Sequence, residues 1–548
     1  MSAPRFSIIT PVHRPPLALL RAMLGSLAAQ TEPDWELCVV DDGSNDDGVT
    51  AELAAFASHR RVRMARHAQG RGIVAASNAA LALATGEFVV LVDHDDRLTP
   101  GALASMADAI DANPEVDYLY SDEDKLAPDG TVYDTFRKPD WSPERLRSQN
   151  YCTHLSVLRR SLVDEVGGFR TGFDGSQDHD LILRVSERAR LIVHVPDVLY
   201  HWCITPGSTA GDAEAKPYAR EAGRRAVAEH LDRLGVDATV EHLATPGHFR
   251  VRRTIPDPAP RVSIVVPTAG NRRPVWGVTR TLVVDLLDSL FEVTDYPDIE
   301  VVVVTDPRTP SDVRGALDER PVTVIDADGP FNFSRWCNAG VAASSGELVL
   351  LLNDDMRVEQ PDWLRVMVGI LTAADDVGVV GARLLYADGT LQHGGILLNE
   401  QPLHIFHGFG GDDPGVFGLL EIDREVSAVT GACLLTRRSL WDRLGGLPEE
   451  FAVAFNDLDY CLRVRASGGR VIWTPHATLY HFESQSRQPD ADPDEIARLY
   501  RRWSPELHRD PYGNPHFAPR QAMWLEADRA TGRAVARRSW RQLRSRHR

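Results

Sequence analysis

The sequence has few cysteines, no long apolar run and no excess of basic residues, and each absence excludes a class of protein. The six cysteines are scattered over 548 residues without a CxxC pair or metal-site spacing, so we expect reduced, mostly buried thiols in a cytoplasmic protein. Apolar stretches such as Leu348 to Leu352 are far shorter than the roughly 20 residues that span a bilayer, and no charged-then-apolar signal opens the chain. A net charge of −18 argues against nucleic acid as a partner.

Phosphate-binding loops are missing as well. No P-loop and no GxGxxG follows the first expected strand, which argues against an NTPase and a dinucleotide enzyme. The segments in the corresponding places read TPVHRPP (Thr10 to Pro16) and PTAGNRRP (Pro267 to Pro274). Neither supplies the glycine-rich loop that a nucleotidyltransferase making activated sugars would need.

What the chain does contain is a long internal repeat. GEFVVLVDHDD at Gly86 to Asp96 aligns without a gap to GELVLLLNDDM at Gly346 to Met356. Each copy opens with a similar strand and turn, FSIITPV at Phe6 to Val12 and VSIVVPT at Val262 to Thr268. Each copy closes with an acidic segment, SQDHD or FNDLD, followed by a histidine in YHW or YHF. Features repeated in one order predict duplicated domains that carry two similar sites.

The length supports two domains, because 548 residues are too many for one core. Short β-branched runs alternate with helical patterns, which predicts an α/β fold in which each domain has a mostly parallel, Rossmann-like sheet flanked by helices. The predicted segments are a first domain at 5–245, a Pro- and Arg-rich linker at 246–260, a second domain at 261–490 and a helical, basic tail at 491–548.

Acidic side chains follow the expected strands, where ligands bind in α/β sheets. A buried, unpaired carboxylate would cost several kcal/mol, so these residues are site candidates, with a turn or a helix cap as the alternative. Two carboxylates one residue apart suit a divalent cation, Mg²⁺ or Mn²⁺, and a ribose. The residues are Asp41 and Asp42 after LCVV, Asp93 and Asp95 after FVVLV, and Asn353 and Asp355 in the second copy.

Two further pairs repeat near the end of each copy. Asp178 and Asp457 each precede a helical pattern, where an aspartate acts either as a helix N-cap or as a general base for an attacking hydroxyl. His201 and His481 each follow a short apolar strand. Such a histidine is either a structural hydrogen bonder or a neutral ligand that completes the metal shell with Asp95 or Asp355.

These motifs carry a family resemblance. SIITPV, CVVDDGSNDD, SNAALALATGEFVVLVDHDD and SQDHDLILR resemble the family 2 glycosyltransferases, which have the A-type nucleotide-sugar fold. The second half, with PFNFSRWCNAG, GELVLLLNDDM, VGVVGARLLYADGTLQHGG and FNDLDYCLR, is similar to bacterial enzymes that build O-antigen, capsule and related polysaccharides, including rhamnosyltransferase-like members. The chain therefore resembles a tandem, two-domain form of that family.

The resemblance implies a nucleoside-diphosphate sugar as donor and an inverting single displacement that needs no protein nucleophile. A divalent cation would stabilise the departing nucleoside diphosphate. In the first domain the resemblance implies that Asp42, and less surely Asp41, contacts the nucleobase, Asp93 the ribose and diphosphate, Asp95 and His201 the cation, and that Asp178 is the catalytic base. In the second domain the corresponding residues are Asp306 for the nucleobase, Asn353 for the ribose and diphosphate, Asp355 and His481 for the cation, and Asp457 as the base.

The second copy departs from the first at its donor site. It has TDPR (Thr305 to Arg308) in place of DDGS, and Asn353 in place of Asp93, so two carboxylates are lost. In both copies, Gln177 or Asn456 precedes the expected base where many family members have Glu, which should leave the pKa of that base less raised. We expect two active domains. The alternative is one active domain with a catalytically silent domain that binds a glycan or a partner.

The acceptor implied by the resemblance is a growing bacterial surface glycan or a lipid-linked saccharide. The last twenty residues, Arg529 to Arg548, contain eight arginines and no acid, with Trp540 and Leu543 among them. Two interpretations stay open: a solvated basic tail, or a surface helix that docks on anionic lipid. The second would place the protein at the inner face of the cell membrane.

Overall fold

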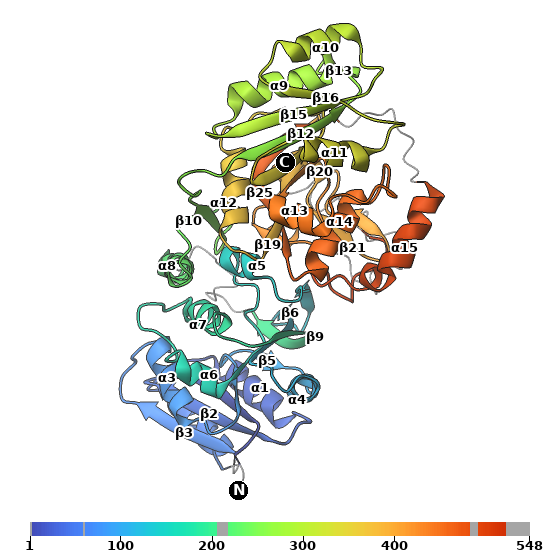
Figure 1. The fold of residues 1–548 in the computed structure, drawn as a ribbon. Helices are drawn as coiled ribbons and strands as arrows, with labels where there is room; N and C mark the ends of the chain where they lie inside the picture. The colour runs from blue at the N-terminus through green and yellow to red at the C-terminus, as the bar shows by residue number, and fades with distance from the viewer. Residues whose placement is uncertain (1–2, 59–60, 205–216, 483–491, 522–548) are drawn as a thin grey trace. The chain divides into compact units, whose positions relative to one another are not determined.

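The computed structural model describes residues 3–58, 61–204, 217–482 and 492–521 (Figure 1). The chain divides into two compact units. Unit 1 comprises Met1–Trp141, Leu146–Val236 and Val240–Arg250, and unit 2 comprises Ser142–Arg145, Asp237–Thr239 and Val251–Arg548. The arginine-rich segment 529–548 lies outside the described residues.

Unit 1 is built on one large sheet with the strand order β3-β2-β1-β4-β8-β6-β9-β5, and β7 pairs with β6. β1 pairs in parallel with β2 and β4, β2 with β3, and β6 with β9, whereas β8, β5 and β7 run antiparallel to their neighbours. The strands are β1 (Phe6–Val12), β2 (Trp35–Asp42), β3 (Val62–His67), β4 (Phe88–Leu91), β5 (Arg97–Leu98), β6 (Tyr118–Leu126), β7 (Val132–Phe136), β8 (Ser156–Arg159) and β9 (Ile192–Cys203).

Helices connect the parallel strands of unit 1. The helix after β2 is capped by Asp46, whose Oδ1 accepts hydrogen bonds from the backbone amides of Gly48 and Val49. The next helix, α3, packs on β1 and β2. The helices are α1 (Leu17–Ala28), α2 (Asp47–Phe56), α3 (Ile73–Leu83), α4 (Ala102–Ala112), α6 (Arg160–Glu165), α7 (Gln177–Ser186) and α8 (Pro217–Arg233). The short α5 (Pro143–Ser148) begins in the segment Ser142–Arg145 of unit 2 and ends in unit 1.

Unit 2 repeats this plan with the strand order β16-β15-β12-β17-β24-β19-β25-β18. Its central strand β17 is apolar and buried at every position, as expected for a strand covered on both faces. The strands are β12 (Val262–Thr268), β15 (Ile299–Thr305), β16 (Thr323–Asp326), β17 (Leu348–Leu352), β18 (Met356–Val358), β19 (Val377–Leu385), β20 (Leu391–His393), β23 (Arg424–Glu425), β24 (Cys433–Arg437) and β25 (Arg470–His481).

The helices of unit 2 lie between these strands, and α12 packs on β19 and β25. None of the helices in the described part of the chain is long and apolar enough to cross a membrane. The helices are α9 (Leu282–Val293), α10 (Ser311–Asp318), α11 (Phe333–Ala342), α12 (Trp363–Thr372), α13 (Arg438–Leu444), α14 (Asn456–Ala466), α15 (Pro493–His508) and the short η1 (Val416–Gly418).

Unit 2 also contains strand pairs outside its main sheet. One is a hairpin of β13 (Arg272–Val275) and β14 (Val278–Thr281) between β12 and α9. The other pairs β21 (Ile396–Leu398) with β22 (Pro402–His404). In addition, the predicted linker 246–260 is not wholly irregular, because β11 (Phe249–Arg253) pairs with β10 (Ala238–His242).

Candidate active site

In unit 1 a pocket lies at the carboxyl ends of β1 and β4, the edge of the sheet where ligands bind in α/β folds. Asp93 follows β4 in the chain, and Asp178 stands in the first turn of α7. Both line the pocket, so the fold brings together the residues predicted to contact donor and acceptor. Other lining residues are Ile9, Ile73, Ser77, Thr153, His154, Phe169 and Gln177.

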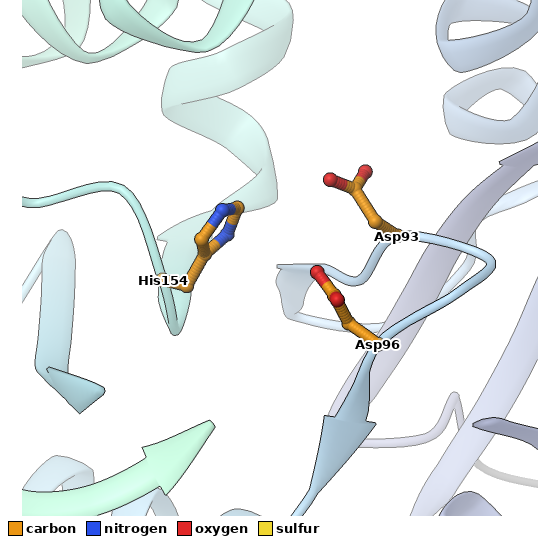
Figure 2. Close-up of side chains that lie close together, drawn as sticks. All are labelled: Asp93, Asp96 and His154. Atoms are coloured by element: carbon orange, nitrogen blue, oxygen red, sulfur yellow. The ribbon is translucent and has the colours of Figure 1, made fainter. Parts of the chain in front are cut away.

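Asp93, Asp96 and His154 lie close together beside this pocket. Figure 2 shows the two carboxylates, from the loop between β4 and β5, and the imidazole of His154, from the segment before β8. Their potential ligand atoms lie within 4.8 Å of one another. Among the described residues, this is the one group of three His, Cys, Asp or Glu side chains that lie so close together. Burial raises the pKa of Asp93, and burial with Asp93 and Asp95 nearby raises the pKa of Asp96 well above its ordinary range. A divalent cation would offset this concentration of negative charge.

Asp96 is also fixed by the protein itself. One oxygen accepts a hydrogen bond from Tyr200 Oη at 2.6 Å and the other from the backbone amide of Cys203 at 2.7 Å. The ring of Tyr200 stacks on His154 with centroids 4.5 Å apart. These contacts hold two members of the group in place, as hydrogen bonds and ring contacts around a metal site orient its ligands.

Asp178 is not the N-cap of α7. That position belongs to Ser176, and the carboxylate of Asp178 instead accepts a hydrogen bond from Asn150 Nδ2 at 3.1 Å. Its place in the pocket with Asp93 leaves room for an acceptor hydroxyl nearby. The general-base role stays a prediction, with a geometry that suits it.

The structure does not bring Asp95 and His201 together by a hydrogen bond or ion pair in the described residues. His201 Nδ1 pairs instead with Asp124 Oδ1 at 2.6 Å. The reason is strand register, because β9 pairs His201 with Arg97, whereas β25 of unit 2 pairs its histidine with Met356. A slip of one residue turns a side chain to the other face of a strand.

Asp42 lies at the end of β2, where a nucleobase contact was predicted. His67 Nδ1 lies 2.6 Å from one of its oxygens, and the backbone amides of Arg71 and Gly72 donate to the carboxylate. Burial acts in the opposite direction, but these hydrogen bonds lower the pKa of Asp42. Asp41 is buried beside it. Both carboxylates thus shape the turn after β2, and their contact with a nucleobase stays a prediction.

In unit 2 the predicted residues do meet. His481 Nε2 lies 3.0 Å from Asp355 Oδ1 and 3.4 Å from Asn353 Nδ2. His481 Nδ1 lies 2.9 Å from the side-chain amide oxygen Oε1 of Gln392, which comes from β20. Asp355, His481 and Gln392 are each less than 10% exposed, and Asn353 Oδ1 is a buried oxygen without a hydrogen-bond partner.

This arrangement fits a cation. With its Nδ1–H donated to Gln392, a neutral His481 presents the lone pair of Nε2 to the carboxylate of Asp355. Two acceptors at that distance repel unless the ring carries a second proton or a cation lies between them. The unpartnered amide oxygen of Asn353 would be the third ligand, beside the carboxylate of Asp355 and Nε2 of His481. Such a set of oxygen and nitrogen ligands suits Mn²⁺ or Mg²⁺.

The other two predicted residues of unit 2 are engaged by the protein. The carboxylate of Asp306 is bound by Arg308, at 2.8 Å from its Nη2, and this hydrogen bond lowers the pKa of Asp306. Asp457 lies in the first turn of α14 and accepts backbone amides from Gly431 at 2.7 Å and from Leu458 at 2.7 Å. A ligand at either carboxylate would have to displace or share these donors.

Comparison with known proteins decides the family. The family model described as glycosyl transferase family 2 matches residues 7–167, and that described as glycosyltransferase like family 2 matches residues 259–505. The PGL/p-HBAD biosynthesis glycosyltransferase of Mycobacterium bovis is 30% identical over 205 residues, which cover 36% of this chain and 76% of that protein. The chain belongs to glycosyltransferase family 2.

Two relatives match this family 2 chain over most of its length. An uncharacterized protein of Sinorhizobium fredii is 42% identical over 538 residues, covering 94% of this chain and 58% of that protein. The O-antigen biosynthesis protein RfbC of Myxococcus xanthus is 39% identical over 527 residues, covering 94% of this chain and 40% of that protein. The chain thus spans about half the length of these relatives. The predicted family, the tandem form and the A-type α/β fold are confirmed.

Sequence reasoning missed three residues of the two family 2 domains. Asp96 and His154 correspond to Met356 and Ala432 in the second copy, so the repeat gave no sign of them. Gln392 lies in LQHGG, a motif that carried the resemblance without a stated role. The available signals were a histidine just before an expected strand and the polar residue within the LQHGG motif.

Proposed function

We propose that the chain is a metal-dependent, inverting glycosyltransferase that moves sugars from nucleoside-diphosphate sugars to a growing bacterial surface glycan. The observation that carries the proposal is the pocket of unit 1, in which Asp93 and Asp178 share one cavity at the carboxyl ends of the strands. The family membership and the similarity to an O-antigen biosynthesis protein support the reaction class and the type of product.

Asp178 takes the proton of the acceptor hydroxyl as that oxygen attacks the anomeric carbon of the donor. Asn150 holds the carboxylate and keeps it oriented toward the pocket. The sugar–phosphate bond breaks as the new glycosidic bond forms, and the configuration at the anomeric carbon inverts. A bound divalent cation supplies charge stabilisation for the leaving nucleoside diphosphate.

The cation in unit 1 has two candidate sets of ligands. One is the predicted pair Asp95 and His201, and the other is the group of Asp93, Asp96 and His154. In unit 2 the candidate set is Asp355, His481 and Asn353. Each set combines carboxylate or amide oxygen with imidazole nitrogen, as Mn²⁺ accepts.

Two donor sites make the protein bifunctional in this proposal, with Asp457 as the second base. A second candidate function has its own support. Because Asp306 is bound by Arg308 and Asp457 by two backbone amides, unit 2 is also suited to be a silent domain that binds a glycan or a partner. The acceptor would be a glycan or a lipid-linked saccharide at the cytoplasmic face of the membrane.

The deciding experiment measures nucleoside diphosphate released from UDP-, dTDP- and GDP-sugars in the presence of Mn²⁺ and lipid-linked saccharides extracted from bacterial membranes. The variants are Asp178→Asn, Asp457→Asn and the double variant. A bifunctional enzyme loses one of two activities with each single substitution and both with the double one. If Asp178→Asn alone abolishes transfer and Asp457→Asn leaves it intact, unit 2 is a binding domain. Full transfer by the double variant would refute the proposed bases.

A further inference from the structure

A hairpin that only unit 2 has carries an exposed tryptophan. In unit 1 the four residues 13–16 join β1 to α1, whereas in unit 2 the hairpin of β13 and β14 lies between β12 and α9. Trp276 and Gly277 form its turn, with φ angles of 48° and 78°. Two left-handed residues are what a two-residue hairpin turn requires, but tryptophan rarely adopts this conformation. A residue held in such a conformation is a reason to look for function.

Trp276 is fixed although it is exposed. Its Nε1–H donates to the backbone carbonyl of Ala387 at 2.7 Å. Its ring meets Tyr480 and Phe482 nearly at right angles, with centroids 5.3 and 5.1 Å apart. Even so, 46% of the residue is exposed to solvent. The ring is thus an apolar surface that is held in a fixed orientation and is partly open to solvent.

The tryptophan lies beside the candidate cation site of unit 2. Tyr480 and Phe482 flank His481, the last residue of β25, and the backbone amide of Phe482 donates to the carbonyl of Asp355 at 2.9 Å. The guanidinium of Arg357, two residues after Asp355, lies 5.8 Å from the centroid of the Trp276 ring. Three neighbours of the ring, Tyr480, Phe482 and Arg357, therefore lie within two residues of Asp355 or His481 in the chain.

We propose that Trp276 stacks against a pyranose ring of the acceptor saccharide in unit 2. A pyranose has an apolar face of C–H groups that packs on an aromatic ring, while its hydroxyls remain free for polar partners. The guanidinium of Arg357 lies over the ring and is held there by Asp285, whose two carboxylate oxygens accept from its Nη1 at 3.1 Å. The inference rests on the proposed function, since it assigns the sugar that the site of unit 2 receives.

The sheet order favours a sugar over the nucleobase of the donor. The predicted nucleobase residue, Asp306, follows β15, which is the second strand from one end of the sheet. Trp276 contacts residues of β25 and β18, the last two strands at the opposite end. A nucleobase bound at Asp306 and a sugar ring stacked on Trp276 would therefore occupy different parts of the site.

The test is saturation-transfer NMR on the full chain with methyl β-D-glucopyranoside, methyl α-D-mannopyranoside and UMP as probes. Because stacking selects the apolar face and tolerates different hydroxyl patterns, we expect wild type to bind at least one glycoside. Trp276→Ala should weaken this binding about tenfold, as the loss of a stacked ring does. Trp276→Phe should retain it. Val278→Ala, at an exposed position of the same hairpin, is the matched control and should bind as wild type does.

Three results would overturn the inference: no transfer to either glycoside in wild type, equal binding by Trp276→Ala with an unchanged melting temperature, or loss of UMP binding instead of glycoside binding. Release of nucleoside diphosphate from donor alone with Mn²⁺ is measured in parallel. If Trp276→Ala still releases nucleoside diphosphate, the substitution has affected only the binding of the acceptor sugar. The glycosyltransferase assignment itself fails only if wild type also releases none.

Discussion

Replacing Glu144 by alanine should destabilise unit 2. Glu144 belongs to the segment Ser142–Arg145, which is part of unit 2 although the residues on both sides of it belong to unit 1. Its carboxylate binds the guanidinium of Arg253 and lies 3.2 Å from Arg470 Nη1. The side chains of Glu144 and Arg253 are 3% and 2% exposed. Removing this carboxylate takes one anionic partner away from two largely buried guanidinium groups of unit 2.

The expected loss of unfolding free energy depends on which acidic partners Arg253 and Arg470 keep. Breaking a buried pair by removing one partner costs roughly 3–5 kcal/mol. Arg253 keeps Asp423 at 3.6 Å and Arg470 keeps Glu425 at 2.9 Å, so we expect the lower end of that range. About 3 kcal/mol corresponds to a fall of roughly 6 °C or more in the melting temperature of unit 2.

The assay is differential scanning calorimetry of the full chain, in which unit 2 is followed as its own transition. Glu450→Ala is the matched control, because Glu450 pairs with Arg502 at the surface of the same unit with both side chains more than 40% exposed. Such a pair contributes at most about 1 kcal/mol. If Glu144→Ala lowers the melting temperature no more than this control does, the segment is not an integral part of unit 2 and the reasoning is wrong.

Three shorter predictions concern other parts of the molecule. Burial alone would lower the pKa of His194, but its hydrogen bonds to Asp122 and Asp140 raise it. The protonated histidine therefore contributes its full stabilisation below about pH 6.5, and this contribution is lost as the pH rises through the pKa of the folded state. His194→Gln should lower the unfolding free energy more at pH 6 than at pH 9 in urea titrations, and equal losses at the two pH values would contradict this. Gln392→Ala should weaken Mn²⁺ binding in unit 2 by about tenfold in EPR titrations while Gln392→Glu retains it, and an unchanged affinity would remove Gln392 from the support of the histidine. All six cysteines are buried, and burial raises the pKa of the Cys38 thiol to about 12, so a thiol reagent should label none before denaturation and all six after it; fast labelling of the native protein would show that these thiols are not buried.

The fold was predictable because its signals are local and repeated. Apolar runs such as LCVV and LVLLL became buried strands, and the copied motifs placed Asn353 and Asp355 beside His481. In the second domain the motifs thus predicted that these three side chains lie together, whereas their binding of a cation stays a prediction. A repeat can predict such a pair because both copies fold on the same strand order.

Other parts of the candidate site depend on geometry that one sequence does not encode locally. His201 matches His481 in sequence, yet a one-residue difference in strand pairing turns it toward Asp124. His154 comes from a distant segment and has no counterpart in the second copy, so only the fold places it beside Asp93.

The measurement that tests the central claim most directly is calorimetry of nucleotide-sugar binding with Mn²⁺, using UDP-, dTDP- and GDP-sugars on wild type, Asp95→Ala and Asp355→Ala. We predict two binding events in wild type, each removed by its own substitution, which would establish two cation-dependent donor sites. One event lost only with Asp95→Ala would mean that unit 2 has kept the fold without a donor. No binding of any of these donors in the presence of the metal would contradict the account.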